Sequence, residues 1–313
     1  MTRKIIITSD PGQDQAAAIF LFLGRRDAFE VLGIVATAGN IDMSHTEKNC
    51  RKLLELADRR DIPVCIGCTR PMRRELVMAA HVHGPTGLDG PVLPEPSMAL
   101  SPRHGVDFII DTIRNAPPKT ITICSLSPLT NLAMALVKAP DIAARIEEVV
   151  MMAGAYFEGG NISVAAEFNV FVDPEAADVV LLSGMKITML PLDVTHQMLS
   201  TRERLAAMRA TGTACGIATA AMLEFSEAFD LKKYGWNGAP LHAPCVPVFM
   251  LRPDSFSGRD INVSVELSGQ LTLGMTVADW WRITDRPRNV FYVRDGDPQI
   301  FYDCLNHALA GLP

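Results

Sequence analysis

The sequence predicts an α/β fold, with a mostly parallel, doubly wound sheet and a helical and mixed C-terminal elaboration. The first observation is that short β-branched or aliphatic runs alternate repeatedly with stretches of helical period up to about residue 200, which is the pattern of successive βα units. The second is that the pattern becomes mainly helical after that point. Because no internal repeat, low-complexity tract or linker interrupts the chain, we expect one domain over residues 1–313.

The N-terminal segment predicts a strand, a turn and a helix. Residues 4–8 are rich in isoleucine, a polar turn with proline and glycine follows, and an alanine-rich apolar stretch begins at Ala16. This order places Asp10 and Asp14 at the carboxyl end of the first strand, where open α/β sheets form ligand crevices and helix N-termini offer free N–H groups. A plainer interpretation makes Asp10 the start of a turn and Asp14 a helix cap. It accounts for Asp14 better than for Asp10.

The next segments continue the alternation. Apolar runs and periodic stretches predict, in order, a strand at 31–37, a helix at 43–60, a strand at 63–66, a helix at 106–113, a strand at 120–124 and a helix at 128–137. Residues 70–102 read as a loop, and a loop of this length in a compact domain is more often functional than idle. A lid over a binding site is one such function.

The C-terminal half begins with a strand and a glycine-rich loop. The predicted elements are a strand at 148–152, a helix opened by Asp173 as N-cap, a strand at 186–190, helices at 201–230 and 246–251, strands at 261–267 and 289–294, and a last helix at 299–309. Phe225, Phe229 and Tyr234 fit two interpretations, closing over a ligand or packing in the core. For His196 we expect a hydrogen-bonded structural role.

The composition excludes several classes of protein. With 313 residues, 48% of them hydrophobic and 20% charged, the chain can bury a large core. The net charge of -6 offers no basic patch for a phosphate backbone, so a nucleic acid is not the expected partner. No stretch approaches a membrane span and the start leads directly into a strand, from which we expect a cytoplasmic protein.

The seven cysteines indicate reduced thiols. Their odd number and apolar surroundings suit a reducing compartment. Cys65 and Cys68 form a lone CxxC pair without a second ligand pair or an adjacent helix start. Redox or zinc chemistry at this pair is therefore a minor alternative.

Polar side chains follow nearly every predicted strand. Amides and carboxylates hydrogen-bond hydroxyl groups bidentately, as the binding of a sugar demands. Each residue alone also fits a turn or a cap, but their shared position at strand ends favours a site for a polyhydroxyl ligand. The residues are Asp10 and Asp14 after the first strand, Asn40 after the second, Ser125 to Asn131 after the fourth, and Asn161, Glu167 and Asn169 after the fifth.

Motifs along the whole chain resemble those of the inosine/uridine-preferring nucleoside hydrolase family, in the same order. They are Asp10-Pro11-Gly12-Gln13-Asp14, Ala38-Gly39-Asn40, His83-Gly84-Pro85-Thr86-Gly87-Leu88, Ser127-Pro128-Leu129-Thr130-Asn131-Leu132, Asn161 with the segment from Ala166 to Ala177, and Leu241-His242-Ala243-Pro244-Cys245. The resemblance implies a nucleoside hydrolase fold with a mostly parallel core and homodimers or homotetramers. It also implies hydrolysis of the N-glycosidic bond of ribonucleosides with a bound calcium ion.

The resemblance also assigns roles to residues. Such hydrolysis passes through an oxocarbenium-like state, which needs an activated water, contacts to the ribose hydroxyls and a proton for the departing base. The implied catalytic residues are Asp10, as general base, and His242, which faces the base. The implied metal ligands are Asp10, Gln15 and the backbone carbonyl of Leu126. The implied substrate-binding residues are Asp14, Asn40, Asn161, Glu167 and Asn169 for ribose, and His83, Met152 and Phe168 for the base.

The motifs depart from the family pattern around the expected calcium ion. The family opening reads Asp-Thr-Asp-Pro-Gly-x-Asp-Asp, whereas this chain has Thr8 and Gln15 at the first and last of these positions. The later His-Asp pair is His242-Ala243 here. Gln15 can supply one neutral oxygen and Ala243 none, and calcium affinity follows the number of carboxylates. We therefore expect calcium from the family, but weak or absent calcium binding in this chain.

Two hypotheses for the function remain open. In the first, the protein still hydrolyses a ribonucleoside or related riboside, with weak or absent calcium. In the second, it is a catalytically silent paralogue that binds nucleosides or ribose-like ligands as a sensor, carrier or assembly partner. A haloacid-dehalogenase-like phosphatase would need two carboxylates flanking one residue after the first strand, which Thr8 and Gly12 do not supply.

Overall fold

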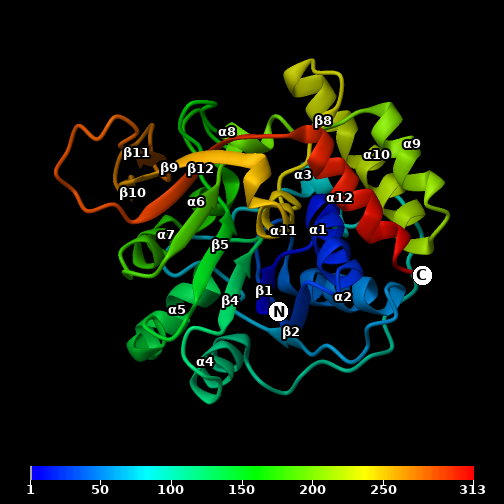
Figure 1. Ribbon diagram of the computed structural model, residues 1–313, viewed down its shortest axis with the longest axis horizontal. Coiled ribbons are helices and arrows are strands. Elements are labelled where there is room, and N and C mark those ends of the chain that lie inside the picture. Colours follow the sequence, from blue (N-terminus) through cyan, green and yellow to red (C-terminus); the bar gives the residue numbers. More distant parts are fainter. Residues whose placement is uncertain (1) are drawn as a thin grey trace.

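The computed structural model describes residues 2–313 and has an eight-stranded central sheet (Figure 1). Its strands, in spatial order, are β3 (Val64–Ile66), β2 (Phe29–Ala36), β1 (Arg3–Ser9), β4 (Ile121–Ser125), β5 (Glu148–Met152), β6 (Ile187–Leu190), β12 (Val290–Gly296) and β9 (Phe256–Ile261). All neighbours pair in parallel except β9, which is antiparallel to β12. The predicted fold class is confirmed.

The order of the strands reverses beside β1. The chain moves from β1 outward to β2 and β3, and then returns to the other side of β1 with β4, β5 and β6. In doubly wound sheets the ligand crevice lies outside the carboxyl ends of the strands at such a reversal. The residues that follow β1, β2 and β4 are therefore placed beside one another by topology alone.

Helices cover both faces of the sheet, and β1 shows how (Figure 1). Ile5 and Ile7 point into one core and Ile6 into the other, because successive side chains of a strand alternate between faces. The first core is shared with α1 (Gln13–Gly24), α2 (Met43–Leu56), α9 (Arg202–Ala210), α10 (Ala214–Tyr234), α11 (Cys245–Leu251) and α12 (Pro298–Ala310). The second is shared with α4 (Gly105–Asn115), α5 (Thr130–Lys138) and α7 (Pro174–Leu181).

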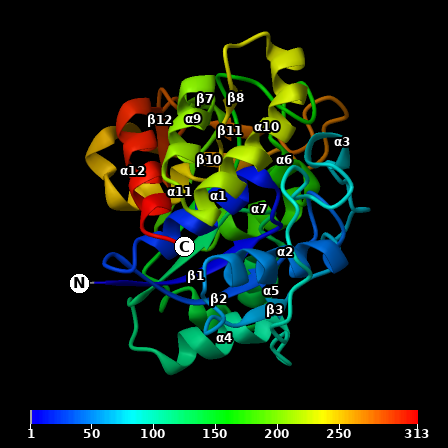
Figure 2. The same cartoon turned by 90° about the vertical axis from the view of Figure 1, so that its right-hand side faces the viewer.

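Short elements complete the chain. They are α3 (Ala80–His83), η1 (Pro140–Ile142), α6 (Phe168–Val172), α8 (Leu192–Thr195), β7 (Leu199–Ser200) paired with β8 (Ala239–Pro240), η2 (Pro253–Ser255), and β10 (Val263–Val265) paired with β11 (Thr276–Ala278). The β10–β11 pair projects at one end of the molecule (Figure 1, orange). α10 lies beside α3 (Figure 2). This contact between distant segments covers the functional pocket described below.

The structure corrects three sequence predictions. The helix predicted at 201–230 is two helices, because Gly212 adopts a positive φ of 74° and the Thr213 side chain caps α10. The helix predicted at 43–60 ends at Leu56. The strand predicted at 261–267 is divided between the end of β9 and the separate strand β10.

Two other features bear on the sequence predictions. Across residues 2–313, no helix is long and apolar enough to cross a membrane. The seven cysteines, all within those residues, are free thiols, as predicted.

Candidate active site

Asp10 lies fully buried at the carboxyl end of β1, beneath the site. Its side chain is 0% exposed, and its Oδ2 accepts a hydrogen bond from the backbone N–H of Asn40 at 2.8 Å. The Asn40 side chain donates back to the Asp10 carbonyl at 3.1 Å. Gly39 is required beside them, since a Cβ there would lie 2.1 Å from Oδ2 of Asp10.

The second oxygen of Asp10 has no partner. Oδ1 is buried and makes no hydrogen bond within residues 2–313. Burial in this position raises the pKa of Asp10 well above its usual value, against the opposing effect of the Asn40 N–H. An unpartnered carboxylate oxygen of this kind suits a water molecule, a substrate hydroxyl or a cation.

The other implied metal ligands fit calcium poorly. The Gln15 Oε1 already accepts a hydrogen bond from the Gly12 backbone N–H at 3.0 Å, and Ala243 contributes only a buried methyl group. Thr8 bonds to the Ser125 hydroxyl at 2.9 Å instead of offering a carboxylate. Calcium takes about 6–8 oxygen ligands and prefers charged ones. Beside the Leu126 carbonyl, these side chains supply a single carboxylate, that of Asp10.

Asp14 connects the first and last segments of the site. Its Oδ2 accepts a hydrogen bond from the backbone N–H of Ala243 at 3.0 Å, and burial raises the pKa of Asp14 to about 6. The interpretation of Asp14 as the cap of α1 is wrong, because Gly12 is the N-cap residue and the Gln15 side chain takes its N–H. Asp14 instead faces the pocket.

Backbone contacts fix the residues that follow β5. Glu167 caps α6 and accepts N–H groups of Asn169, Val170 and Gly154 at 2.8, 3.2 and 2.9 Å. Burial nevertheless raises the pKa of Glu167 to about 7. Asn169 donates from its side-chain nitrogen to the Met152 carbonyl at 3.0 Å, which leaves its Oδ1 available to a ligand.

Two histidines lie at the pocket in neutral form. The Nδ1 of His242 lies 2.7 Å from the Thr195 hydroxyl, and burial lowers the pKa of His242 well below its usual value. His83 donates from Nδ1 to Oε1 of Gln13 at 2.6 Å, and Gln13 donates back to the His83 carbonyl at 2.9 Å. Burial lowers the pKa of His83 to about 4. Both rings can therefore exchange hydrogen bonds without carrying charge.

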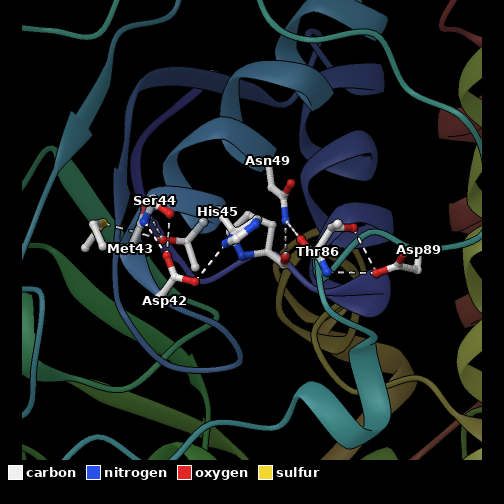
Figure 3. Close-up of polar contacts among 9 residues, drawn as sticks. Asp42, Met43, Ser44, His45, Asn49, Thr86 and Asp89 are labelled. Atoms are coloured by element: carbon white, nitrogen blue, oxygen red, sulfur yellow. Dashed lines mark hydrogen bonds and ion pairs between the residues drawn. The ribbon is translucent and has the colours of Figure 1, made fainter.

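Hydrogen bonds anchor the long loop that carries His83 (Figure 3). Asn49 on α2 donates to the Thr86 carbonyl at 2.8 Å and to the Pro11 carbonyl at 3.1 Å, so one side chain joins the loop to the turn after β1. Asp89 accepts hydrogen bonds from the backbone and hydroxyl of Thr86. The segment predicted as loop at 70–102 is irregular except for α3, and its middle forms one wall of the pocket.

These side chains surround one pocket. It encloses about 890 Å³ not filled by atoms, its open mouth included. Asp10 and Leu126 do not line it, since both are buried beneath its wall. Gln15 does line it. The other sequence-derived residues that line it are Asp14, Asn40, His83, Met152, Asn161, Glu167, Phe168, Asn169 and His242.

Helix α10 contributes residues that sequence reasoning missed. Of the aromatic residues considered, Phe229 and Tyr234 line the pocket whereas Phe225 is 45% exposed on the surface. Ser226, Asp230 and Lys233 also line it. Their spacing of four and three residues places them on one face of the helix. That spacing was the feature of the sequence from which they could have been predicted to share one environment. The Nδ1 of His196 bonds to Glu158 at 3.1 Å, as expected, whereas its buried Nε2 makes no hydrogen bond within residues 2–313.

Comparisons with known proteins identify the family. The profile described as inosine-uridine preferring nucleoside hydrolase matches residues 5–303. The chain is 48% identical over 99% of its length to all of an uncharacterized Schizosaccharomyces pombe protein, and 42% identical over 99% to 97% of the pyrimidine-specific ribonucleoside hydrolase RihA of Shewanella sp. (strain MR-7).

A solved structure agrees with these sequence comparisons. The purine-preferring ribonucleoside hydrolase from Gardnerella vaginalis superimposes with a TM-score of 0.92 at 29% identity, covering 99% of this chain and 98% of the other. Both the sequence and the fold match over nearly the full length. The chain belongs to the inosine-uridine preferring nucleoside hydrolase family.

Proposed function

We propose that this protein hydrolyses the N-glycosidic bond of a ribonucleoside or related riboside to the free base and ribose. The observation that carries the proposal is the pocket itself, in which carboxylates and amides from separate strand ends converge opposite a neutral histidine, His242. Relatives described as ribonucleoside hydrolases support the class of substrate.

The geometry suits the demands of that reaction. Asp14, Glu167 and Asn169 offer acceptor oxygens at the pocket wall for ribose hydroxyls. Asp10 has a free Oδ1 below them for the proton of an attacking water. When the Thr195 hydroxyl donates its hydrogen bond to Nδ1, the ring proton of His242 lies on Nε2, which would donate a hydrogen bond to the departing base.

We propose further that calcium binds weakly or not at all. The support is the donor chemistry: Gln15 is engaged by Gly12, Ala243 has no oxygen to offer, and Asp10 is the only carboxylate among the implied ligands. The steps above therefore use only side chains of this chain.

Binding without turnover is the second candidate function. The same observation favours it, because the side chains available to hold ribose line the pocket while those that would hold a water-activating cation are replaced. In this role the protein would be a sensor, carrier or assembly partner that recognises a nucleoside.

Three broader properties also belong to the proposal. We propose one domain over residues 1–313, a homodimer or homotetramer, and a cytoplasmic protein that acts in purine or pyrimidine salvage. The resemblance to the family is what supports the oligomer and the salvage role.

A hydrolysis assay tests the proposal. Purified protein would be incubated with a panel of ribonucleosides and with p-nitrophenyl riboside, and release of base followed by chromatography, with and without a chelator. We expect turnover that the Asp10→Asn variant loses. No turnover, combined with saturable nucleoside binding by calorimetry, would establish the second candidate instead, and neither turnover nor binding would overturn both.

A further inference from the structure

One face of α10 carries charged side chains into the pocket. Leu223, Ser226, Asp230 and Lys233 follow one another at intervals of three, four and three residues and all line it. Asp230 is the acidic member of this face. Its carboxylate accepts no hydrogen bond within residues 2–313, and the charged groups that act on it are Lys233 and Asp14. The carboxylate therefore keeps its acceptor capacity for a ligand.

Lys233 does not neutralise Asp230 by direct contact. Its Nζ donates to the Asn161 carbonyl at 2.6 Å and lies 4.9 Å from the centre of the Tyr234 ring. The ammonium group thus bonds to the loop after β5, on the opposite side of the pocket, and not to Asp230. Burial raises the pKa of Asp230 to about 6, so that the side chain remains mainly ionised at pH 7 and above and can only accept hydrogen bonds.

The position of α10 places Asp230 near the base, and not the ribose, of a nucleoside bound in the pocket. Asp14 and Asn40 follow β1 and β2 beside the fully buried Asp10. α10 lies beside α3 (Figure 2), and residues of both helices line the pocket. Phe229 of α10 packs edge-on against His81 of α3, with 5.2 Å between the ring centroids. A nucleoside whose ribose occupies the strand ends therefore presents its base towards α10.

We propose that Asp230 determines specificity by selecting nucleosides whose base bears an exocyclic amino group over their keto counterparts. This inference rests on the proposed nucleoside site. An amino group donates hydrogen bonds to the unpartnered carboxylate, whereas a keto oxygen in the same place brings lone pairs against it and leaves both acceptors unsatisfied. The substrate class is cytidine-type or adenosine-type nucleosides.

Matched substrate pairs test this selection. Cytidine competes with uridine and adenosine with inosine in one mixture, and the ratio of products gives relative kcat/KM independently of the active fraction. We expect the native protein to favour the amino member of a pair. Asp230→Asn, whose amide can donate to a keto oxygen, should lower the amino-to-keto ratio roughly tenfold to a hundredfold.

Glu227→Gln supplies the matched control. It removes one carboxylate from the same helix at a position that does not line the pocket, and we expect the ratio to stay unchanged. An equal effect of Asp230→Asn on both members of a pair would overturn the proposal and assign Asp230 to the sugar. So would a native protein without amino preference.

The proposed hydrolysis can fail without the proposed role of Asp230 failing. If neither the nucleosides nor p-nitrophenyl riboside is hydrolysed, the dissociation constants of cytidine and uridine, measured by calorimetry for the native protein and for Asp230→Asn, replace the kinetic ratio. An amino preference that the variant loses would then support the role of Asp230 in a site that binds without turnover. Equal dissociation constants for the two nucleosides would overturn it.

Discussion

The Oδ2 atom of Asp14 accepts a hydrogen bond from the backbone N–H of Ala243 at 3.0 Å, across 229 positions of sequence. This bond joins the start of α1 to the segment that carries His242. Both groups are buried, so the bond is formed without competition from water. It fixes the distance between the side chains proposed for ribose and the histidine proposed for the base.

Asp14→Ala should weaken both the fold and the site. The Ala243 N–H loses its buried acceptor, which costs roughly 1–3 kcal/mol of the free energy of unfolding. Asp14→Asn keeps one acceptor oxygen and should recover most of this loss but not the activity. Thermal melts and p-nitrophenyl riboside kinetics measure the two effects. A melting temperature unchanged in Asp14→Ala would show that the bond does not hold the segments together.

Restoring carboxylates should create calcium affinity. We expect Gln15→Asp combined with Ala243→Asp to bind calcium on the order of a hundredfold more tightly than the native chain, because each adds a charged ligand beside Asp10. The neutral double variant with Asn at both positions controls for side-chain volume. Titration calorimetry is the measurement. Micromolar calcium binding by the native protein would contradict the expectation.

Removing the Thr195 hydroxyl should impair His242. Their contact of 2.7 Å holds the ring and its tautomer. We expect Thr195→Val to lower kcat for purine nucleosides about a hundredfold, the lower end of a general acid's usual contribution. p-Nitrophenyl riboside, whose leaving group needs no proton, should change less. Thr195→Ser retains the hydroxyl and should behave as the native protein does. Equal losses on both substrates would argue against a proton-donating role.

Lys233 should hold α10 against the loop that follows β5. Its bond to the Asn161 carbonyl connects α10 with the loop after β5. In Lys233→Met that connection is lost, and we expect KM to rise about tenfold, the lower end of the effect of one charged hydrogen bond, with a smaller change in kcat. Lys232→Met removes an exposed neighbouring charge and is the control. If the two variants raise KM equally, the effect is one of net charge and not of the connection.

Burial of the Asp230 carboxylate should make the free energy of unfolding fall as the pH rises. Its pKa of about 6 in the folded protein lies above the ordinary value of 3.8. The folded state therefore binds more protons between these values, and the free energy of unfolding falls with increasing pH through this window. Asp230→Asn removes this contribution. The melting temperature of the variant, relative to the native protein, should therefore be higher at pH 7 than at pH 4. A difference that is constant with pH would contradict the assignment.

The local sequence predicted the bounds of strands and helices well where the side chains of the element are buried. The strand predicted at 148–152 coincides with β5, and the helix predicted at 128–137 differs by two residues at its start from α5. The break in the helical run after residue 200 was missed, although Gly212 and Thr213 are stop and start signals, because the apolar period continues on both sides. The prediction of one domain stays a prediction.

The pocket residues after the strands were predictable because parallel strands direct their carboxyl ends to one edge of the sheet. Asp14, Asn40 and Glu167 could therefore be grouped before any contact was known. The hydrogen-bond partners of these residues could not be predicted from the sequence. That Asp14 bonds to Ala243, and that Asp10 retains one oxygen without a partner, depends on how separate loops pack against each other.

The sequence by itself determined the family, the parallel sheet and the residues at its strand ends, since these depend on local periodicity and on motifs of fixed spacing. Only the tertiary structure decided which face of α10 meets the pocket and thereby added Asp230 and Lys233 to it. A helix of this composition has several polar side chains, and its own sequence does not specify which of them will face a cavity formed by other segments, among them the distant ones that carry Asp14, Asn40 and His83.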